Sequence, residues 1–437
     1  MEVQYSPLKL QNDIPKSVYD MIGKVQQELS DSPKLAKMFE DCLINTIGTT
    51  ISRKPDGTTF VITGDIPAMW LRDSAAQVRP YLLLAAEDPE MEAMIAGLVR
   101  RQMDYILLDP YANAFNEAPN GNGHQSDLTE MGPSIWERKY EIDSLAYPLQ
   151  LSYLLWKNSG CVSQFDESYR RAALEIIKLW RVEQHHETES GYRFQRLDAP
   201  LTDTLPREGK GTETVFTGMT WSGFRPSDDA CEYGYLIPAN MFAVVVLRYL
   251  EEIAQEIYKD QELADAAKQL ADEINQGIQE YGVYTHPVYG RIYAYETDGL
   301  GQYNLMDDAN VPSLLSLPYL GYTDESDEVY RNTRKFILSE NNPYYYKGKV
   351  AEGIGSPHTP EGYIWHIALS MQGLTSPERS EKARLLQLIQ DTDAGTGLTH
   401  EGFSVDDAGK FTRPWFSWSN MLFSELIMDY CGIRVLK

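Results

Sequence analysis

Apolar residues recur at helical spacing in long segments along most of this 437-residue chain. Residues 14–47 carry apolar side chains three or four positions apart, and this spacing predicts two helices near the N-terminus. Farther along, segments with one apolar stripe alternate with segments that are apolar on nearly every face. The segments with one stripe span residues 86–107, 165–184, 258–280, 325–340 and 378–391. A helix with one stripe covers a core, and a helix that is apolar all round lies within it, so the pattern predicts alternating outer and inner helices.

The predicted inner helices share polar or acidic N-terminal ends. Six such ends are found, at Asp73, Asp143, Asp228, Asp307–Asp308, Thr359–Glu361 and Trp415–Trp418. With the N-terminal helices as the remaining outer member, six inner–outer pairs predict an all-α fold, an (α/α)6 toroid or barrel. Because no linker or change of composition divides the sequence, we expect one domain over residues 1–437. A generic helical bundle or a two-domain helical protein is the alternative.

Non-helical segments are expected at one end of this toroid. Residues 49–63 alternate in polarity around the turn Pro55–Gly57, which predicts a small β-hairpin. Long loops are expected at residues 107–131 and 192–221. Inner helices that run in one direction bring their starting loops together, so we expect a funnel-shaped pocket there, with free helix N–H groups around it.

The formal net charge of −25, from 39 basic and 64 acidic side chains, narrows the choice of partners. Such a charge repels phosphate backbones and anionic lipid, so we expect neither nucleic acid nor a membrane as a partner. Residues 1–8 lack the pattern of a signal peptide, and no apolar run is long enough to span a membrane. The four cysteines have neither zinc-site spacing nor the pattern of a disulfide framework. We therefore expect a cytoplasmic protein, and the sequence makes no prediction of its oligomeric state.

The loop within residues 221–240 combines an arginine, several aromatic residues and three acids before a long apolar helix. Pro226 disfavours helical geometry at the residue before it, and Ser227 is a suitable N-cap. Because acidic side chains suit a first helical turn, the pattern predicts a helix that begins with Asp228 and Asp229. Capping alone would explain these acids, but the arginine and aromatic residues favour Asp228 as a catalytic acid, with Asp229 as its rival.

Acidic and aromatic residues dominate the predicted starting loops, and the sequence lacks metal-ligand spacing, a glycine-rich phosphate loop and a GxSxG elbow. We therefore expect no metal and no cofactor. Hydrolysis of a glycosidic bond needs a protonated carboxyl group and a carboxylate, which lie about 6.5–9.5 Å apart in an inverting enzyme. The acid must keep its proton, so we expect burial or Asp229 to raise the pKa of Asp228. Glu141 and Asp143 are expected only to cap a helix.

Three motifs, in order along nearly the whole chain, resemble those of glycoside hydrolase family 125, the bacterial and fungal exo-α-1,6-mannosidases. They are Thr63–Ser74, Phe224–Ala230 and Gly397–Phe403. The resemblance implies an (α/α)6 barrel that hydrolyses its substrate with inversion and without a metal. It also implies that Asp228 is the general acid and Glu401 the general base.

Eight further residues are candidate ligands of the sugar. They are Trp70, Arg72, Asp73, Arg225, Asp308, His358, His400 and Trp418. Each has a structural alternative. Arg72 and Asp73 also suit an ion pair at a helix start, and the tryptophans suit core packing. His400 either orients Glu401 or is an ordinary loop residue.

These observations predict a glycoside hydrolase, an exo-acting α-mannosidase that removes terminal α-1,6-linked mannose from a mannose-containing oligosaccharide. The linkage is implied by the resemblance. Asp228 is predicted to protonate the leaving oxygen, and Glu401 to activate water, with inversion of configuration. The alternatives are an inverting (α/α)6 hydrolase of the glucosidase or trehalase type and a sugar-binding protein that has lost catalysis.

Overall fold

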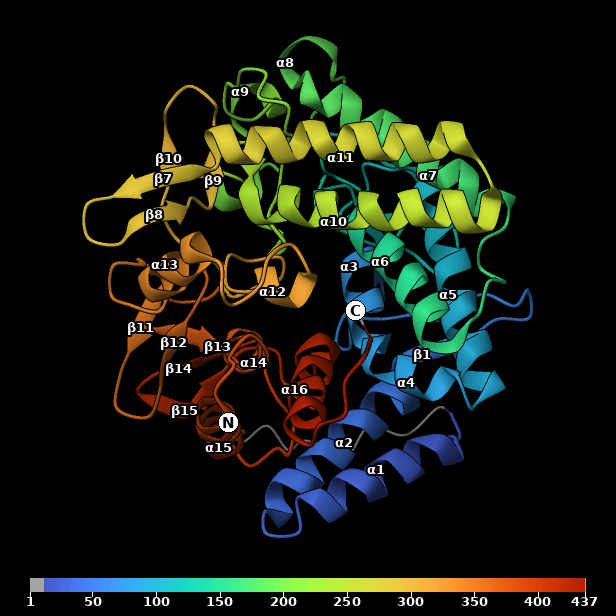
Figure 1. The fold of residues 1–437 in the computed structure, drawn as a ribbon, viewed down its shortest axis with the longest axis vertical. Coiled ribbons are helices and arrows are strands. Elements are labelled where there is room, and N and C mark those ends of the chain that lie inside the picture. The colour runs from blue at the N-terminus through green and yellow to red at the C-terminus, as the bar shows by residue number, and fades with distance from the viewer. Residues whose placement is uncertain (1–11, 437) are drawn as a thin grey trace.

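Helices alternate between an inner and an outer ring in the computed structural model, which describes residues 12–436 (Figure 1). The inner helices are α3 (Leu71–Val78), α6 (Ile142–Ser159), α10 (Ile237–Ile253), α12 (Leu317–Leu320), α14 (His366–Leu374) and α16 (Ser417–Tyr430). The outer helices are α2 (Pro33–Thr49), α5 (Pro89–Leu108), α7 (Glu167–Gln184), α11 (Gln261–Tyr281), α13 (Glu328–Ile337) and α15 (Arg379–Asp391). Helix α1 (Lys16–Glu28) packs against α2. The arrangement confirms the predicted (α/α)6 fold class.

The apolar pattern explains which helices lie inside. Helix α11 buries one stripe that includes Leu263, Leu270 and Ile274, and the rest of its surface faces solvent. In α10, by contrast, every residue from 237 to 247 is buried, and in α6 every residue from 142 to 155. Burial of these apolar faces between the rings contributes about 25 cal/mol per Å² of buried surface.

The third inner helix begins later than predicted. It starts at Ile237, so the predicted cap Ser227 and the predicted first-turn residue Asp228 lie in the loop before it. Asp228 has φ of 67°, in the left-handed region that an α-helix excludes. The loop also packs closely on Trp221, because a Cβ atom added at Gly234 would lie 2.0 Å from Nε1 of that ring. These long-range contacts override the local capping signal.

The fourth and fifth inner helices also begin after their predicted starts. Asp307 precedes α12 in a loop and accepts hydrogen bonds from the amides of Leu314 and Leu315, at 2.8 and 3.0 Å. Residues 359–361 lie before a short strand rather than in the first turn of α14. The polar residues at both positions therefore belong to starting loops.

Short antiparallel strands connect these loops. The first pair, β1 (Ile51–Arg53) and β2 (Thr59–Val61), confirms the predicted hairpin. The others, which the sequence analysis did not predict, are β3 (Met69–Trp70), β4 (Ala114–Phe115), β5 (Ile135–Glu137), β6 (Tyr235–Leu236), β7 (Val283–His286), β8 (Gly290–Tyr293), β9 (Glu296–Thr297), β10 (Tyr303–Asn304), β11 (Tyr345–Lys347), β12 (Glu352–Ile354), β13 (Tyr363–Trp365), β14 (Gly402–Ser404) and β15 (Asp407–Phe411). Strands β3, β6 and β13 directly precede α3, α10 and α14 and pair with later strands, so they fix where these helices begin.

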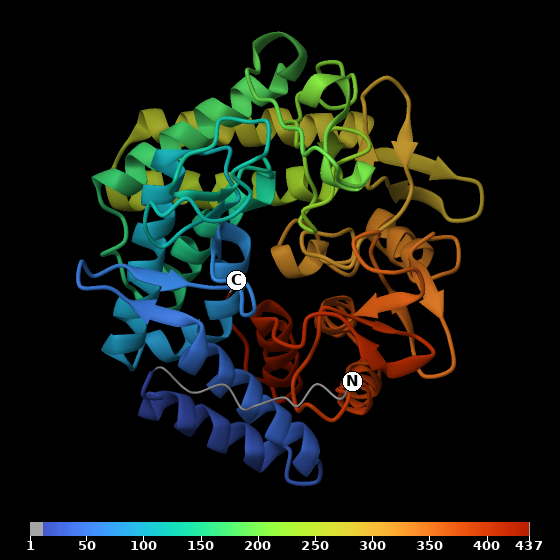
Figure 2. The ribbon, with the colours of Figure 1, turned by 180° about the vertical axis from the view of Figure 1, so that it is seen from behind.

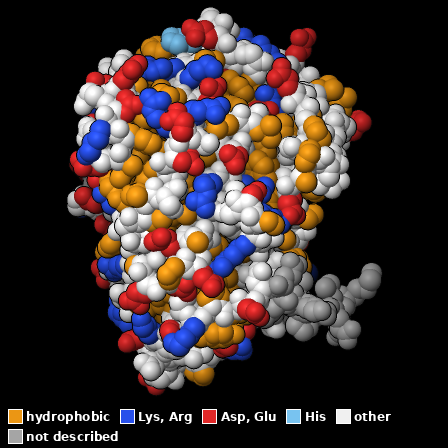
Figure 3. All heavy atoms as spheres, turned by 90° about the vertical axis from the view of Figure 1, so that its right-hand side faces the viewer, with side chains coloured by type: hydrophobic (Ala, Val, Ile, Leu, Met, Phe, Trp, Pro, Cys, Tyr) orange, Lys and Arg blue, Asp and Glu red, His pale blue; other side chains and the backbone are white. Residues whose placement is uncertain are grey.

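The surface of the ring differs from one view to another. In the reverse view, loops and short strands lie across the helices (Figure 2). On the side in Figure 3, side chains of both charges are interspersed with apolar ones. No helix within residues 12–436 combines the length and the apolar character that crossing a bilayer requires. The expectation about a signal peptide concerns residues 1–8, which lie outside the described residues.

Candidate active site

A pocket with about 340 Å³ of empty space, counted with the part that is open to solvent, lies at the end of the ring where the inner helices begin. Five of the six starting segments contribute to its lining. The lining residues are Thr63, Ile66, Trp70, Arg72 and Asp73 around the start of α3, Pro226, Ser227 and Asp228 before α10, Asn310 before α12, His358 and Trp365 before α14, and Glu401, Arg413, Phe416 and Trp418 around the start of α16. The shared direction of the inner helices thus gathers polar side chains from most of the chain.

Seven of the ten site residues named from the sequence line this pocket. They are Trp70, Arg72, Asp73, Asp228, His358, Glu401 and Trp418. Arg225, Asp308 and His400 do not line it. The structure therefore brings Asp228 and Glu401 into one cavity from segments that precede different inner helices.

Asp228 is held in a tight turn. Its amide donates to the carbonyl of Arg225 at 2.9 Å, and the amide of Arg225 donates to the carbonyl of Asp229 at 2.8 Å. The left-handed backbone at Asp228 permits this turn, and aspartate tolerates it better than most residues. Nη2 of Arg72 and Nδ2 of Asn113 donate to Oδ1 of Asp228 at 3.0 and 3.3 Å. The turn therefore directs the carboxyl group toward a guanidinium and an amide.

The surroundings of Asp228 set its protonation. Burial raises its pKa, but the charge of Arg72 and a hydrogen bond with Glu141 lower the pKa well below its ordinary value. The charges of Lys139 and His358 act in the same direction. The predicted rise in the pKa of Asp228 is therefore wrong for the substrate-free protein, because the sequence did not show that a guanidinium would contact this acid. At neutral pH Asp228 is a carboxylate.

Arg72 contacts four carboxyl groups, two of which, those of Asp228 and Asp73, belong to residues that line the pocket. Nη1 donates to Oε2 of Glu141 at 2.6 Å and to Oδ2 of Asp143 at 3.2 Å, while Nε lies 3.4 Å from Oδ2 of Asp73. The expectation that Glu141 and Asp143 only cap α6 is wrong. The cap of α6 has no side-chain hydrogen bond, and both buried carboxyl groups turn to the arginine, which offsets the cost of burying charge.

Glu401 directly precedes β14 and is 6% exposed. Nη1 of Arg413 lies 3.6 Å from its Oε1. Nε of Arg413 also donates to Oδ1 of Asp65 at 3.1 Å, so this arginine links two acids. The sequence analysis missed Arg413, because only the pairing of β14 with β15 brings residue 413 back beside residue 401.

His358 lies in the loop between β12 and β13 and lines the same pocket. Burial lowers its pKa, but the hydrogen bond and charge of Asp229 raise it, as do the charges of Glu401 and Asp228. The pKa of His358 is raised to about 9. The pocket therefore contains a protonated imidazole near both candidate carboxylates at neutral pH.

Aromatic rings and polar atoms without a hydrogen bond complete the pocket. The ring centroid of Trp418 lies 5.5 Å from the guanidinium carbon of Arg72. Nε1 of Trp70, Oδ2 of Asp73 and Oγ of Ser227 are buried and have no hydrogen-bond partner among residues 12–436. Because unpaired buried polar groups are costly, their place beside a pocket suits a ligand rich in hydroxyl groups.

Arg225 and Asp308 bind to other parts of the protein. Nε of Arg225 donates to Oε1 of Glu296, in β9, at 2.6 Å. Asp308 accepts hydrogen bonds from Nδ2 of Asn310 at 2.9 Å and from Oγ of Ser356 at 3.1 Å. Arg225 thereby anchors the turn that carries the candidate acid, and Asp308 holds Asn310, which lines the pocket.

His400 lies behind its neighbour Glu401. Its ring stacks on Phe411, with centroids 3.8 Å apart, and its side chain is fully buried. Burial lowers the pKa of His400 to about 4, so the imidazole is neutral at pH 7. These contacts support the strand pair β14–β15, which directly follows Glu401.

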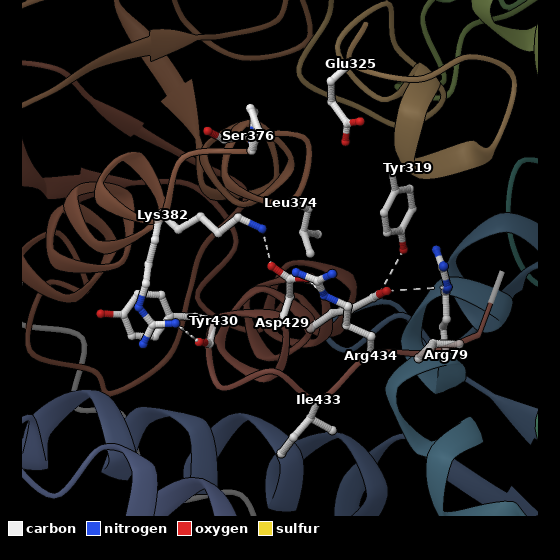
Figure 4. Close-up of a pocket in the computed structure, with 14 residues that line it drawn as sticks. Arg79, Tyr319, Glu325, Leu374, Ser376, Lys382, Asp429, Tyr430, Ile433 and Arg434 are labelled. Atoms are coloured by element: carbon white, nitrogen blue, oxygen red, sulfur yellow. Dashed lines mark hydrogen bonds and ion pairs between the residues drawn. The ribbon is translucent and has the colours of Figure 1, made fainter.

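A larger cavity, with about 1140 Å³ of empty space, lies at the other end of the ring, where α14 and α16 end (Figure 4). Two of its acids, Glu425 and Asp429, lie in or next to the last turns of α16. Glu425 accepts a hydrogen bond from Tyr319 at 2.9 Å and pairs with Arg79, and Asp429 pairs with Lys382. Because the lining of this cavity contains no tryptophan and none of the ten site residues named from the sequence, the smaller pocket is the better candidate active site.

The acids at the smaller pocket are paired with basic side chains. Asp228 contacts Arg72, Glu401 lies near Arg413, and Asp229 contacts a histidine. Over residues 12–436, no group of three or more His, Cys, Asp or Glu side chains is arranged to hold a metal ion. The arrangement therefore balances carboxylate charge with guanidinium groups.

Comparisons with known proteins show similarity over nearly the whole chain. The family model described as metal-independent alpha-mannosidase (GH125) matches residues 32–428. A Streptococcus pneumoniae member of the metal-independent α-mannosidases, solved as a non-productive substrate complex with α-1,6-mannobiose, is 52% identical. The similarity covers 96% of this chain and 99% of that chain, with a TM-score of 0.95. The meiotically up-regulated gene 157 protein of Schizosaccharomyces pombe is 43% identical over 438 residues, which cover 95% of this chain and 85% of that protein.

A more distant similarity concerns the fold alone. The neutral trehalase of Saccharomyces cerevisiae matches with a TM-score of 0.53 at 11% identity, over 87% of this chain and 76% of that chain. Identity at this level supports a shared architecture and says nothing about the substrate.

Proposed function

This chain belongs to the metal-independent α-mannosidases of glycoside hydrolase family 125, and from this premise we propose that it is an exo-acting enzyme that releases terminal α-1,6-linked mannose with inversion of configuration. One observation carries the proposal: Asp228 and Glu401 line one pocket, on segments before different inner helices. Inverting hydrolysis needs such a pair, because one carboxyl group protonates the leaving oxygen while the other activates water on the opposite face of the sugar.

The substrate class is supported by the relative from Streptococcus pneumoniae, which was solved with α-1,6-mannobiose in work on the processing of N-linked glycans. We propose a mannose-containing oligosaccharide of this kind as the substrate. Exo action is supported by the floor of the pocket, where the side chains of Arg72 and Trp418 are buried. A closed floor admits a terminal sugar and excludes the middle of a chain.

Asp228 is proposed as the general acid and Glu401 as the general base. The side chain of Asp228 is 24% exposed and lines the pocket, so its carboxyl group can reach a glycosidic oxygen there. Glu401 takes a proton from water as the oxygen of that water attacks the anomeric carbon. Because Asp228 is charged in the substrate-free protein, it must gain a proton before it can donate one.

The pocket's polar atoms that lack a hydrogen bond among the described residues are proposed ligands of the mannose hydroxyl groups. They belong to Trp70, Asp73 and Ser227. Burial raises the pKa of Asp73 to about 6, so this group changes its protonation close to physiological pH. Trp418 supplies an aromatic face, which suits the C–H face of a sugar ring.

Proton NMR of the first product formed from α-1,6-mannobiose tests the mechanism. We expect β-mannose before mutarotation. Initial α-mannose would contradict inversion, and an absence of cleavage would contradict the substrate. Cleavage of trehalose or isomaltose instead would favour the glucosidase-type alternative, and binding of mannobiose without turnover would favour a sugar-binding protein.

The variant D228N tests the acid. Asparagine tolerates the left-handed backbone of residue 228, so the turn is expected to persist. We expect kcat on α-1,6-mannobiose to fall about 10²- to 10⁴-fold, the usual contribution of a positioned acid. An unchanged kcat in a folded D228N protein would remove Asp228 from this role.

A further inference from the structure

Two carboxyl groups, those of Asp228 and Glu141, share the same two partners. Arg72 donates from Nη2 to Asp228 at 3.0 Å and from Nη1 to Glu141 at 2.6 Å. Nδ2 of Asn113 lies 3.3 Å from Oδ1 of Asp228 and 3.4 Å from Oε1 of Glu141, besides a contact of 3.0 Å with Oε2 of Glu137. The guanidinium and the amide therefore hold the two carboxyl groups side by side.

This cluster cannot be fully ionised. Arg72 contacts four carboxyl groups, those of Asp73, Glu141, Asp143 and Asp228. Lys139 and His358 add positive charge near Asp228, and Arg413 near Asp73, so Arg72 is the cation that Glu141 and Asp143 must share. Neighbouring buried carboxylates repel one another, so a proton stays within such a group at neutral pH. The charged and titratable groups that face Glu141 are Arg72, Asp143, Asp228 and Cys231.

Burial favours the proton on Glu141 when the pocket contains no substrate. The side chain of Glu141 is fully buried, whereas that of Asp228 is 24% exposed to the pocket. Burial raises the pKa of Glu141 well above its ordinary value, while the charge of Arg72 and the hydrogen bond with Glu141 lower that of Asp228. The solvated member of the pair therefore carries the charge, and the buried member carries the proton.

We propose that Glu141 stores the proton that Asp228 delivers to the leaving oxygen, so that the two carboxyl groups act as one acid. This inference rests on the proposed role of Asp228. A bound sugar removes water from Asp228, and desolvation disfavours its charged form. The proton then moves from the Glu141 carboxyl group to Asp228, and Arg72 stabilises the new Glu141 carboxylate.

The bond changes balance along this route. As the C1–O bond breaks, its electron pair stays on the glycosidic oxygen, which takes the proton from Asp228. Glu401 removes a proton from water as the water oxygen bonds to C1. Release of that proton to solvent and return of one proton to Glu141 restore the resting state. Glu141 is thus a positioning residue for the proton and does not contact the substrate.

Asp143 provides a matched control within the same cluster. Its Oδ2 accepts from Nη1 of Arg72 at 3.2 Å, the same nitrogen that binds Glu141. No hydrogen bond among the described residues links Asp143 to Asp228 or to Asn113. Asp143 therefore shares Arg72 with Glu141 and acts on Asp228 through its charge, but it has no hydrogen-bonded link through which a proton could pass to Asp228.

Two substrates separate proton delivery from structure. Cleavage of α-1,6-mannobiose expels an alkoxide that needs a proton, whereas 2,4-dinitrophenyl α-mannoside expels a phenolate that needs none. We expect kcat of D228N to fall about 10²- to 10⁴-fold on mannobiose and far less on the aryl substrate.

E141Q keeps the shape of the Glu141 side chain and a hydrogen-bond donor but has no proton to give. We expect E141Q to show the same pattern, with a loss on mannobiose at least about ten-fold larger than on the aryl substrate, and D143N to lower both rates by one common factor.

The outcomes distinguish this inference from the proposed function. If E141Q lowers both rates equally while D228N does not, Glu141 is only structural and the inference fails. If D228N itself shows no dependence on the leaving group, the proposed acid fails. E141D retains a carboxyl group one methylene shorter, and we expect it to recover about ten-fold on mannobiose over E141Q. If E141Q does not fold, the rates of E141D are compared with those of the wild type on the two substrates. An equal loss on both overturns the inference.

Discussion

Nδ1 of His358 lies 3.1 Å from Oδ1 of Asp229, although 129 positions separate the two residues in the chain. Burial alone would lower the pKa of His358, yet this contact and the charges of Glu401 and Asp228 raise it to about 9. The imidazolium thus joins the loop before α14 to the loop that carries the candidate acid. It also places a positive charge in the pocket wall at neutral pH.

This contact predicts a pH-dependent contribution to stability. A histidine whose pKa is higher in the folded state stabilises the fold below its unfolded pKa of about 6.5, and that contribution is lost as the pH rises through the folded value. The contribution of His358 is therefore present at pH 6 and lost as the pH rises through about 9. D229N should reduce this pH dependence, as measured by urea unfolding at pH 6 and pH 10.

NMR titration provides the matching direct measurement. In D229N the pKa of His358 should fall toward its ordinary value, because the neutral amide no longer favours the imidazolium. The buried His400, whose pKa is lowered to about 4, serves as the control and should titrate as in the wild type. A wild-type His358 that titrates near 6.5 would contradict the prediction.

The ion pair between Arg225 and Glu296 predicts a loss of stability on substitution. Both side chains are buried, and Glu296 has no other cation within ion-pair distance among the described residues. R225M leaves a buried carboxylate without its cation, which should cost about 3–5 kcal/mol in the free energy of unfolding. Urea unfolding of R225M checks the value, and the double variant R225M/E296L should recover much of the loss.

An exposed ion pair gives the control for this prediction. Lys268 and Asp272 are 53% and 48% exposed, so K268M should change the free energy of unfolding by at most about 1 kcal/mol. Equal losses in the free energy of unfolding for R225M and K268M would show that burial does not determine the cost of breaking an ion pair. R225M should also lower kcat, because Arg225 anchors the turn of Asp228 to β9.

The ring architecture was predictable because helical periodicity is a local signal. The buried faces of α10 and α11 follow from spacing within each helix. The start of α10 was not predictable in the same way. It depends on the left-handed backbone of Asp228 and on the contact of Gly234 with the ring of Trp221, and neither is a local propensity.

The candidate site was predictable where a residue lies in a recognisable motif. Asp228 and Glu401 were identified in this way, but their protonation depends on partners that are distant in the chain. Arg72 reaches Asp228 across 156 positions, and Arg413 reaches Glu401 through the pairing of β14 with β15. A single sequence carries no signal for such contacts, so the pKa of Asp228 was predicted in the wrong direction.

A chelator is expected to leave activity unchanged. The acids at the pocket are balanced by Arg72, Arg413 and His358, and the family is described as metal-independent. Incubation with EDTA followed by assay on α-1,6-mannobiose should give the same kcat as untreated enzyme. A loss that zinc or calcium restores would contradict the prediction, and a metal-dependent mannosidase treated in parallel shows that the chelator acts.

Variants of Glu401 and Arg413 are expected to lose activity on both substrates, whereas D228N is expected to lose it mainly on mannobiose. E401Q should lower kcat about 10²- to 10⁴-fold on both α-1,6-mannobiose and 2,4-dinitrophenyl α-mannoside, because water must be activated whichever group leaves. Arg413 lies 3.6 Å from Glu401, so R413M should lower both rates by about ten-fold or more through misplacement of the carboxylate. R413K keeps the charge and should recover part of this loss. D65N is the control, since it neutralises the other acidic partner of Arg413 and leaves the charges of Arg413 and Glu401 unchanged. A selective loss of E401Q on mannobiose alone would instead assign Glu401 to proton donation and reverse the proposed roles of the two carboxylates.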